Sequence, residues 1–245
     1  MKHGQPSSLG VLLAISPSRP AFPALLSYLR KRIEQDAPTY LYALDEGGAA
    51  IVSPELIELS RDCLRLFCCS QAAERWGVAH HQEITRAGLG LLDDLMVATD
   101  RFLVLTPSTP DPARIDQDFP VDSVPLPARS SREVLVILER PPDSDSHAAE
   151  GLRVASGLAA GRRLRVTFAV RGWGPPRNLQ DLGWILDPVL AGHLDVLVAT
   201  DAGILAVAGE HEIGGKLSSG KVPIVVVTED ELARLAGTAF AVLRF

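Results

Sequence analysis

The chain has 245 residues, of which 47% are hydrophobic and 22% are charged, a composition typical of soluble globular proteins. Its net charge of −6 argues against a nucleic-acid-binding protein, because no basic stripe is available to neutralise phosphates. No apolar run reaches the roughly 18 residues that a membrane-spanning helix needs, and three cysteines are too few for a secreted disulfide framework. We therefore expect a cytoplasmic protein that binds neither nucleic acid nor membrane.

The first part of the chain alternates apolar runs of strand length with segments of helical periodicity. Continuous apolar runs are typical of strands that are buried on both faces of a sheet. The predicted strands are 10–16, 39–45, 64–69 and 101–107, and the predicted helices are 22–35 and 54–62. A further helix is expected after Cys69, with Ser70 as its N-cap and Gly77 at its end.

The middle of the chain has a different composition. Residues 106–131 contain six prolines and show little apolar periodicity. Such a stretch can continue neither a helix nor a central strand. We predict a Pro-rich linker over residues 108–130.

The last part of the chain repeats the order of elements found in the first. The predicted strands are 133–139, 164–170, 194–200 and 222–228, and the predicted helices are 147–161 and 178–192. Strands that alternate with helices imply parallel sheets. We predict two α/β domains, 1–107 and 131–245, each a mainly parallel sheet flanked by helices and related to the other by an internal repeat. Sites in such sheets form at the carboxyl ends of the strands.

All three cysteines, Cys63, Cys68 and Cys69, fall within seven positions. Successive strand residues face opposite sides, so Cys68 and Cys69 cannot enter the same core. Cys69 ends the predicted strand and precedes a predicted helix, and the positive end of a helix favours a thiolate. Arg75, His80 and His81 are candidate sources of further positive charge. The alternative of three buried, inert thiols is equally open, because free cysteine is often buried.

The cysteines and nearby histidines supply the ligand types of a metal site but not its spacing. Neither a C-x-x-C nor an H-E-x-x-H pattern is present. A disulfide between adjacent cysteines would be strained and easily reduced. We predict no structural metal and no cofactor.

Residues 69–78, Cys-Ser-Gln-Ala-Ala-Glu-Arg-Trp-Gly-Val, resemble the active-cysteine motif of the DsrE/TusD family. In that family a cysteine ends a strand, and an Ala-rich turn with Arg-Gly-Val follows at similar spacing. Residues 87–107 resemble the family's next segment. In the second half, residues 150–172 and 241–245 are similar to the DsrF/TusC relatives. The resemblance implies two fused DsrE/F-like domains.

The same resemblance implies a function in sulfur relay. These families carry sulfur as a cysteine persulfide between small proteins, in tRNA thiolation or in sulfur oxidation. Only Cys69 matches the active position, so it would carry the sulfur between donor and acceptor proteins. The second half has no cysteine, although a thiol would be expected where its predicted third strand ends, at residues 199–201, if that domain were active. That domain is therefore expected to be structural or partner-binding.

The contact surface that we predict on the second domain contains Arg171, Trp173 and Arg177, although a rigid solvent-facing turn explains the same residues. Two other functions stay open. The protein could be a small-ligand-binding or regulatory module in which Cys69 is incidental. It could also be a thiol redox sensor, in which Cys68 or Cys63 resolves an oxidised Cys69. The sequence leaves a homo-oligomer open.

Overall fold

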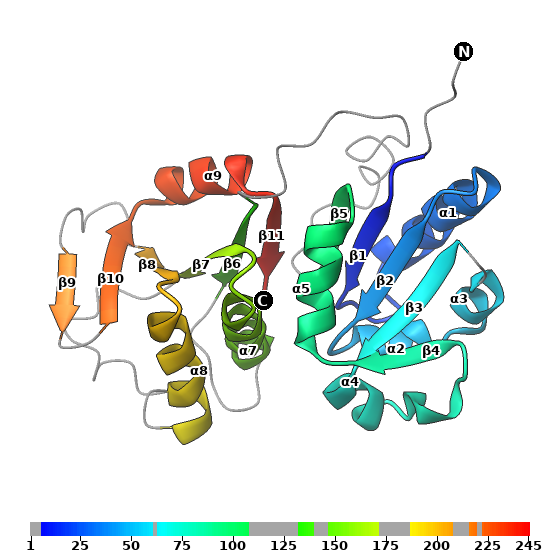
Figure 1. Ribbon diagram of the computed structural model, residues 1–245, viewed down its shortest axis with the longest axis horizontal. Helices are drawn as coiled ribbons and strands as arrows, with labels where there is room; N and C mark the ends of the chain where they lie inside the picture. The colour runs from blue at the N-terminus through cyan, green and yellow to red at the C-terminus, as the bar shows by residue number, and fades with distance from the viewer. Residues whose placement is uncertain are drawn as a thin grey trace, which may run out of the picture. The chain divides into compact units, whose positions relative to one another are not determined.

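The computed structural model describes residues 6–60, 63–107, 132–139, 147–171, 187–207, 216–219 and 222–245. The chain forms two compact units, Met1–Pro127 and Ala128–Phe245. Each unit is built around its own sheet with helices packed against it (Figure 1). The predicted linker over 108–130 lies outside the described residues.

The first unit contains a five-stranded sheet in which all strands are parallel. Its strand order is β4-β3-β2-β1-β5. The strands are β1 (Leu9–Leu13), β2 (Thr39–Ala43), β3 (Leu64–Cys69), β4 (Ile84–Ala87) and β5 (Arg101–Leu105). The helices are α1 (Ala21–Glu34), α2 (Gly47–Ile51), α3 (Pro54–Leu59), α4 (Ser70–Arg75), the 3-10 helix η1 (Val78–His80) and α5 (Leu89–Ala98). Every residue of β1 is buried, as expected for a central strand that is covered on both faces.

The second unit contains a six-stranded sheet of order β11-β6-β7-β8-β10-β9. All of its pairings are parallel except that of β9 with β10. The strands are β6 (Glu133–Leu138), β7 (Arg165–Val170), β8 (Gly203–Val207), β9 (Lys216–Ser219), β10 (Val222–Val227) and β11 (Ala241–Arg244). The described helices are α7 (His147–Ala160), α8 (Pro188–Ala199) and α9 (Glu229–Thr238).

The two sheets share one strand order. The sequence β11-β6-β7-β8-β10 in the second unit corresponds to β5-β1-β2-β3-β4 in the first, and β9 is an addition at one edge. In both units the chain first moves strand by strand in one direction and then returns to pair its last strand with its first. The prediction of two α/β units with mainly parallel sheets and flanking helices is thus confirmed, and the shared order is what an internal repeat produces.

One predicted strand is wrong. Residues 194–200, taken as the third strand of the second domain, belong mostly to α8, and the third strand is β8. Asp187 caps helix α8, because its side chain accepts hydrogen bonds from backbone N–H groups of the first turn. The helix begins at Pro188 and continues through the apolar run. A short apolar run fits a buried helix as well as a strand. Residues 199–201 are therefore not the place where a thiol would be expected, because they follow a helix.

Within the described ranges, no helix has the length and apolar character that a membrane span requires.

Candidate functional site

The candidate site lies at the carboxyl end of β3, where Cys69 is the last strand residue. Its extended backbone, with φ −54° and ψ 135°, makes Cys69 itself the N-cap of α4. The prediction that Ser70 is the N-cap is therefore wrong by one position, because Ser70 already has helical geometry. Helix α4 ends at Arg75, and Gly77 follows in the left-handed conformation (φ 65°) that glycine adopts without strain.

The three thiols differ in burial. The Cys68 residue is 0% exposed and Cys69 is 3% exposed, whereas Cys63 is only half-buried. Burial raises the pKa of the Cys68 thiol to about 12, and the neighbouring Cys69 adds to the effect, whereas Arg86 on the adjacent strand opposes it. Cys68 therefore stays protonated at neutral pH and is a poor nucleophile.

Titration of the Cys68 thiol is expected to lower the free energy of unfolding in alkali. Its folded pKa of about 12 is above the unfolded value of 9.0. The protonated thiol therefore contributes fully to the free energy of unfolding below pH 9, and this contribution is lost as the pH rises towards 12. Between pH 8 and pH 10 the free energy of unfolding should fall by about 1 kcal/mol more in the wild type than in Cys68→Ala, which has no thiol to titrate. Urea unfolding at both pH values measures this difference. Equal losses in the two proteins would contradict the expectation.

Cys63 and Cys69 lie at opposite ends of β3. Six residue steps along an extended strand separate their Cα atoms by about 20 Å. A disulfide joins Cα atoms that are roughly 4.4–6.8 Å apart. In the folded protein Cys63 therefore cannot resolve an oxidised Cys69, and the redox-sensor hypothesis keeps only Cys68 as a partner.

The loop that follows β2 is tied to the end of α4. Asp45, in the left-handed conformation (φ 49°), accepts a hydrogen bond from Arg75 Nη1 at 3.2 Å. Its backbone carbonyl accepts another from Trp76 Nε1 at 2.8 Å. The guanidinium of Arg75 also lies over the Trp76 ring, 5.4 Å from its centroid. These contacts fix the last turn of α4 against the neighbouring strand end.

Two glycines allow the chain to pack closely at this edge, because any side chain at either position would clash with its neighbours. A Cβ atom on Gly47 would lie 1.8 Å from the carbonyl oxygen of Leu13, and one on Gly48 would lie 2.4 Å from Trp76 Cδ1. Gly47 and Gly48 begin helix α2, directly after the loop that follows β2. The sequence signal for this contact was the Gly-Gly pair directly after a buried strand.

The other predicted supporting residues lie apart from the thiols or serve other contacts. Arg75 pairs with Asp45, and its side chain is 66% exposed. Ser70 and His80 are exposed, and His81 is half-buried. No hydrogen bond or ion pair joins either histidine side chain to another described residue. A search of the described part of the chain finds no group of three His, Cys, Asp or Glu side chains that could hold a metal ion.

The predicted contact surface of the second unit is described only in part. Trp173 and Arg177 lie outside the described residues. Arg171, directly after β7, forms ion pairs with Glu139 at 2.7 Å and with Glu229 at 2.8 Å. Burial opposes ionisation of Glu139, but hydrogen bonds from Arg171 and Arg244 lower its pKa. Arg171 thus helps to hold the carboxyl ends of β6, β7 and β11 to the start of α9.

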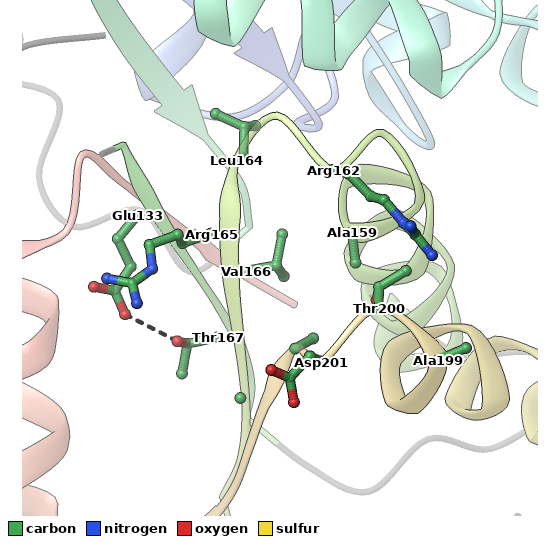
Figure 2. Close-up of a pocket in the computed structure, with 12 residues that line it drawn as sticks. Glu133, Ala159, Arg162, Leu164, Arg165, Val166, Thr167, Ala199, Thr200 and Asp201 are labelled. Carbon is green, nitrogen blue, oxygen red and sulfur yellow. Dashed lines mark hydrogen bonds between the residues drawn. The ribbon is translucent and has the colours of Figure 1, made fainter. Parts of the chain in front are cut away.

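The amino-terminal edges of both sheets contain cavities that the sequence did not predict. One, of about 570 Å³, is lined by Tyr40, Cys63 and Arg65 of the first unit. The other, of about 660 Å³, lies in the second unit (Figure 2). Each cavity lies at the amino-terminal ends of the strands, whereas sites in parallel sheets usually form at the carboxyl ends.

Comparison with protein-family models and with curated proteins found no match for this chain. The resemblance of residues 69–78 to the DsrE/TusD motif stays a prediction.

Proposed function

We propose that the protein is a cytoplasmic sulfur-relay protein that carries sulfane sulfur as a persulfide on Cys69. The observation that supports this most strongly is the position of Cys69. It ends a parallel strand at the carboxyl edge of the sheet and caps the helix that follows, within the segment that resembles the active-cysteine motif. Donor and acceptor proteins would be the partners, and the transfer needs no cofactor.

The chemistry is a thiol exchange at sulfur. The Cys69 thiolate attacks the terminal sulfur of a donor persulfide, R–S–SH. A new S–S bond forms at Cys69 as the S–S bond of the donor breaks, and the donor leaves as the thiolate R–S⁻. Attack by an acceptor thiolate on the terminal sulfur then regenerates the Cys69 thiolate. The sulfane sulfur keeps its oxidation level throughout, so neither step needs an external oxidant or reductant.

The burial of Cys69 means that loading requires a local opening. The Cys69 residue is only 3% exposed, so a donor would reach its thiol when the segment around α4 moves away from the strand end. The hydrogen bond from Trp76 Nε1 to the Asp45 carbonyl holds the far end of that helix. Between loading and delivery the same cover would protect a persulfide from solvent oxidants.

Trp76→Phe tests this cover. Phenylalanine keeps an aromatic ring against Gly48 but cannot donate the hydrogen bond to Asp45. A net loss of about 1 kcal/mol for one hydrogen bond would speed the opening by roughly fivefold. The rate of alkylation of Cys69 by iodoacetamide, followed by peptide mass spectrometry, should rise by that factor. Glu74→Gln, which lies on the same helix and removes only an exposed ion pair with Arg86, is the matched control and should change the rate by less than about twofold. An unchanged rate in Trp76→Phe would show that this contact does not control access.

Discharge by cyanide tests the proposed function. Cyanide takes the terminal sulfur of a persulfide as thiocyanate and returns the thiolate. After incubation with a persulfide donor and removal of excess donor, the full chain should release about one thiocyanate per chain, as expected for a single reactive thiol. Cys69→Ser should release none. Equal release from Cys69→Ser and the wild type would overturn the assignment of the sulfur to Cys69.

A second candidate function is a small-ligand-binding module in which all three thiols are inert. The burial of Cys69 and the cavity in the second unit favour it. In that case no chain would release thiocyanate, and a ligand would bind away from the cysteines.

A further inference from the structure

Tyr42 lies on the same face of the first sheet as the Cys69 side chain. Side chains alternate between the two faces along a strand, and Tyr42 of β2 pairs with Phe67 of β3, so these two share a face. Cys69 comes two residues after Phe67 on β3 and therefore points to that face as well. Cys68 points to the opposite face, where Ala43 is its partner on β2.

The Tyr42 side chain crosses β3 on this face. Its hydroxyl donates a hydrogen bond to the backbone carbonyl oxygen of Ala87 at 3.2 Å. Ala87 belongs to β4, and β3 lies between β2 and β4 in the sheet. Neighbouring strands are about 4.8 Å apart, so the phenol reaches this oxygen by passing over β3.

The crossing point is next to Cys69. Ala87 is the residue of β4 that pairs with Cys69, whereas Tyr42 is in line with Phe67, two residues earlier along β3. The ring therefore runs diagonally over β3 and brings its hydroxyl to the row that contains the thiol. Paired Cα atoms of adjacent strands are about 5 Å apart, so the hydroxyl and the Cys69 sulfur are neighbours on this face.

The surroundings of this pair contain little water. Tyr42 is 0% exposed and Cys69 is 3% exposed. A thiolate at Cys69 loses most of its hydration, and a buried charge is costly unless hydrogen-bond donors replace the water. A phenol hydroxyl carries one donor hydrogen, which rotation about the C–O bond can direct to a different acceptor. The Tyr42 hydroxyl is therefore a donor within reach of the reacting sulfur.

We propose that Tyr42 is a positioning residue of the sulfur relay, whose hydroxyl turns from the Ala87 carbonyl to the Cys69 sulfur when the thiol ionises. Its role in the relay rests on the proposed function, but the contact itself can be measured without a sulfur donor. The thiol proton passes to water, and Tyr42 keeps its own proton. The hydrogen bond stabilises the Cys69 thiolate twice, when it attacks the donor persulfide and when it leaves as the acceptor takes the sulfur.

Tyr40 provides a matched control on the same strand. It lies two residues before Tyr42 and on the same face, but it pairs with Arg65 of β3, four residues before Cys69. Its side chain lines the cavity at the amino-terminal edge of the sheet. Tyr40→Phe therefore removes a hydroxyl from the same strand and face without changing the contact at Cys69.

The pH profile of Cys69 alkylation in the full chain tests the hydrogen bond. The rate of modification by iodoacetamide is followed by peptide mass spectrometry from about pH 5 to about pH 10, because the thiolate is the reacting form. Tyr42→Phe keeps the ring but loses a hydrogen bond to a charged group, so ionisation becomes about tenfold less favourable. The midpoint of its profile should move up by about one pH unit, and below the midpoint its rate should fall about tenfold. Tyr40→Phe should keep the wild-type profile.

A purely structural role for Tyr42 gives a different result. If its ring only covered the thiol, Tyr42→Phe would change the rate by the same factor at every pH and leave the midpoint in place. That outcome, or an unchanged profile, would overturn the proposal, and circular dichroism checks that each variant is folded. The relay is tested separately by incubation with a persulfide donor at neutral pH, where Tyr42→Phe should gain about 32 Da roughly tenfold more slowly than the wild type. If the wild type gained no mass while the Tyr42→Phe midpoint still moved, the relay would be wrong and the contact right.

Discussion

Gly47→Ala is expected to destabilise the first unit by about 3 kcal/mol or more, because the new methyl group meets backbone that cannot yield cheaply. Its Cβ would lie 1.8 Å from the carbonyl oxygen of Leu13 and 2.6 Å from the carbonyl carbon. That oxygen also accepts the backbone N–H of Leu44 at 3.0 Å. Relief of the clash would therefore require the ends of β1 and β2 to separate beside the candidate site.

Urea unfolding followed by Trp76 fluorescence measures this effect. The chain has three tryptophans, so Trp173→Phe and Trp184→Phe in the background leave Trp76 to report on the first unit alone. Gly90→Ala is the matched control, because a Cβ there meets nothing within 4 Å and lies in helix α5. It should be neutral or stabilise by up to about 1 kcal/mol. A Gly47→Ala protein within 1 kcal/mol of wild type would show that the strand ends can separate easily.

Arg32→Ala should be almost as damaging, with an expected loss of about 3 kcal/mol. Burial lowers the pKa of Arg32, and its hydrogen bonds to Thr39, Ser7 and Pro38 offset the cost of holding the guanidinium away from water. Truncation leaves a cavity and removes one donor from each of these three oxygen atoms, of which, among the described residues, only that of Pro38 also accepts a backbone N–H, from Leu9 at 2.9 Å. Each buried acceptor that loses its partner adds to the cost.

The same fluorescence assay applies to Arg32, with Arg30→Ala as control. Arg30 lies on the same helix but is exposed, so its replacement should stay within about 0.5 kcal/mol of wild type. Arg32→Leu should be less harmful than Arg32→Ala because leucine fills more of the space. Equal stability of Arg32→Ala and the wild type would mean that the buried guanidinium contributes nothing net.

The buried strands were the most predictable part of the fold. Continuous apolar runs correctly located β1, β2, β3 and β5 of the first unit, and β6, β7 and β10 of the second. The edge strand β4 was missed because it is only four residues long and two of these are exposed. Strand β8 was missed because the apolar residues of α8, directly before it, resembled a strand.

Only those features of the site that depend on neighbouring residues in the sequence were predictable. The strand end at Cys69 follows from local sequence, whereas the contact of Trp76 with Asp45 joins residues 31 positions apart. Burial of Cys69 also depends on packing from other elements, which periodicity does not report. His80 and His81 follow α4 closely in sequence, but the turn at Gly77 and η1 carry the chain onward to β4. The cavity of the second unit is formed by strand starts and helix ends that lie far apart in the sequence, so local patterns do not predict it.

The most direct test of the sulfur-relay function is to weigh three variants, Cys63→Ser, Cys68→Ser and Cys69→Ser, after incubation with a persulfide donor. Conversion of one thiol to a persulfide adds about 32 Da to the intact mass. We expect Cys63→Ser and Cys68→Ser to gain this mass as the wild type does, and Cys69→Ser to gain none. Equal loading of all three variants would mean that the sulfur binds thiols without selection, and it would contradict the assignment of the relay to Cys69.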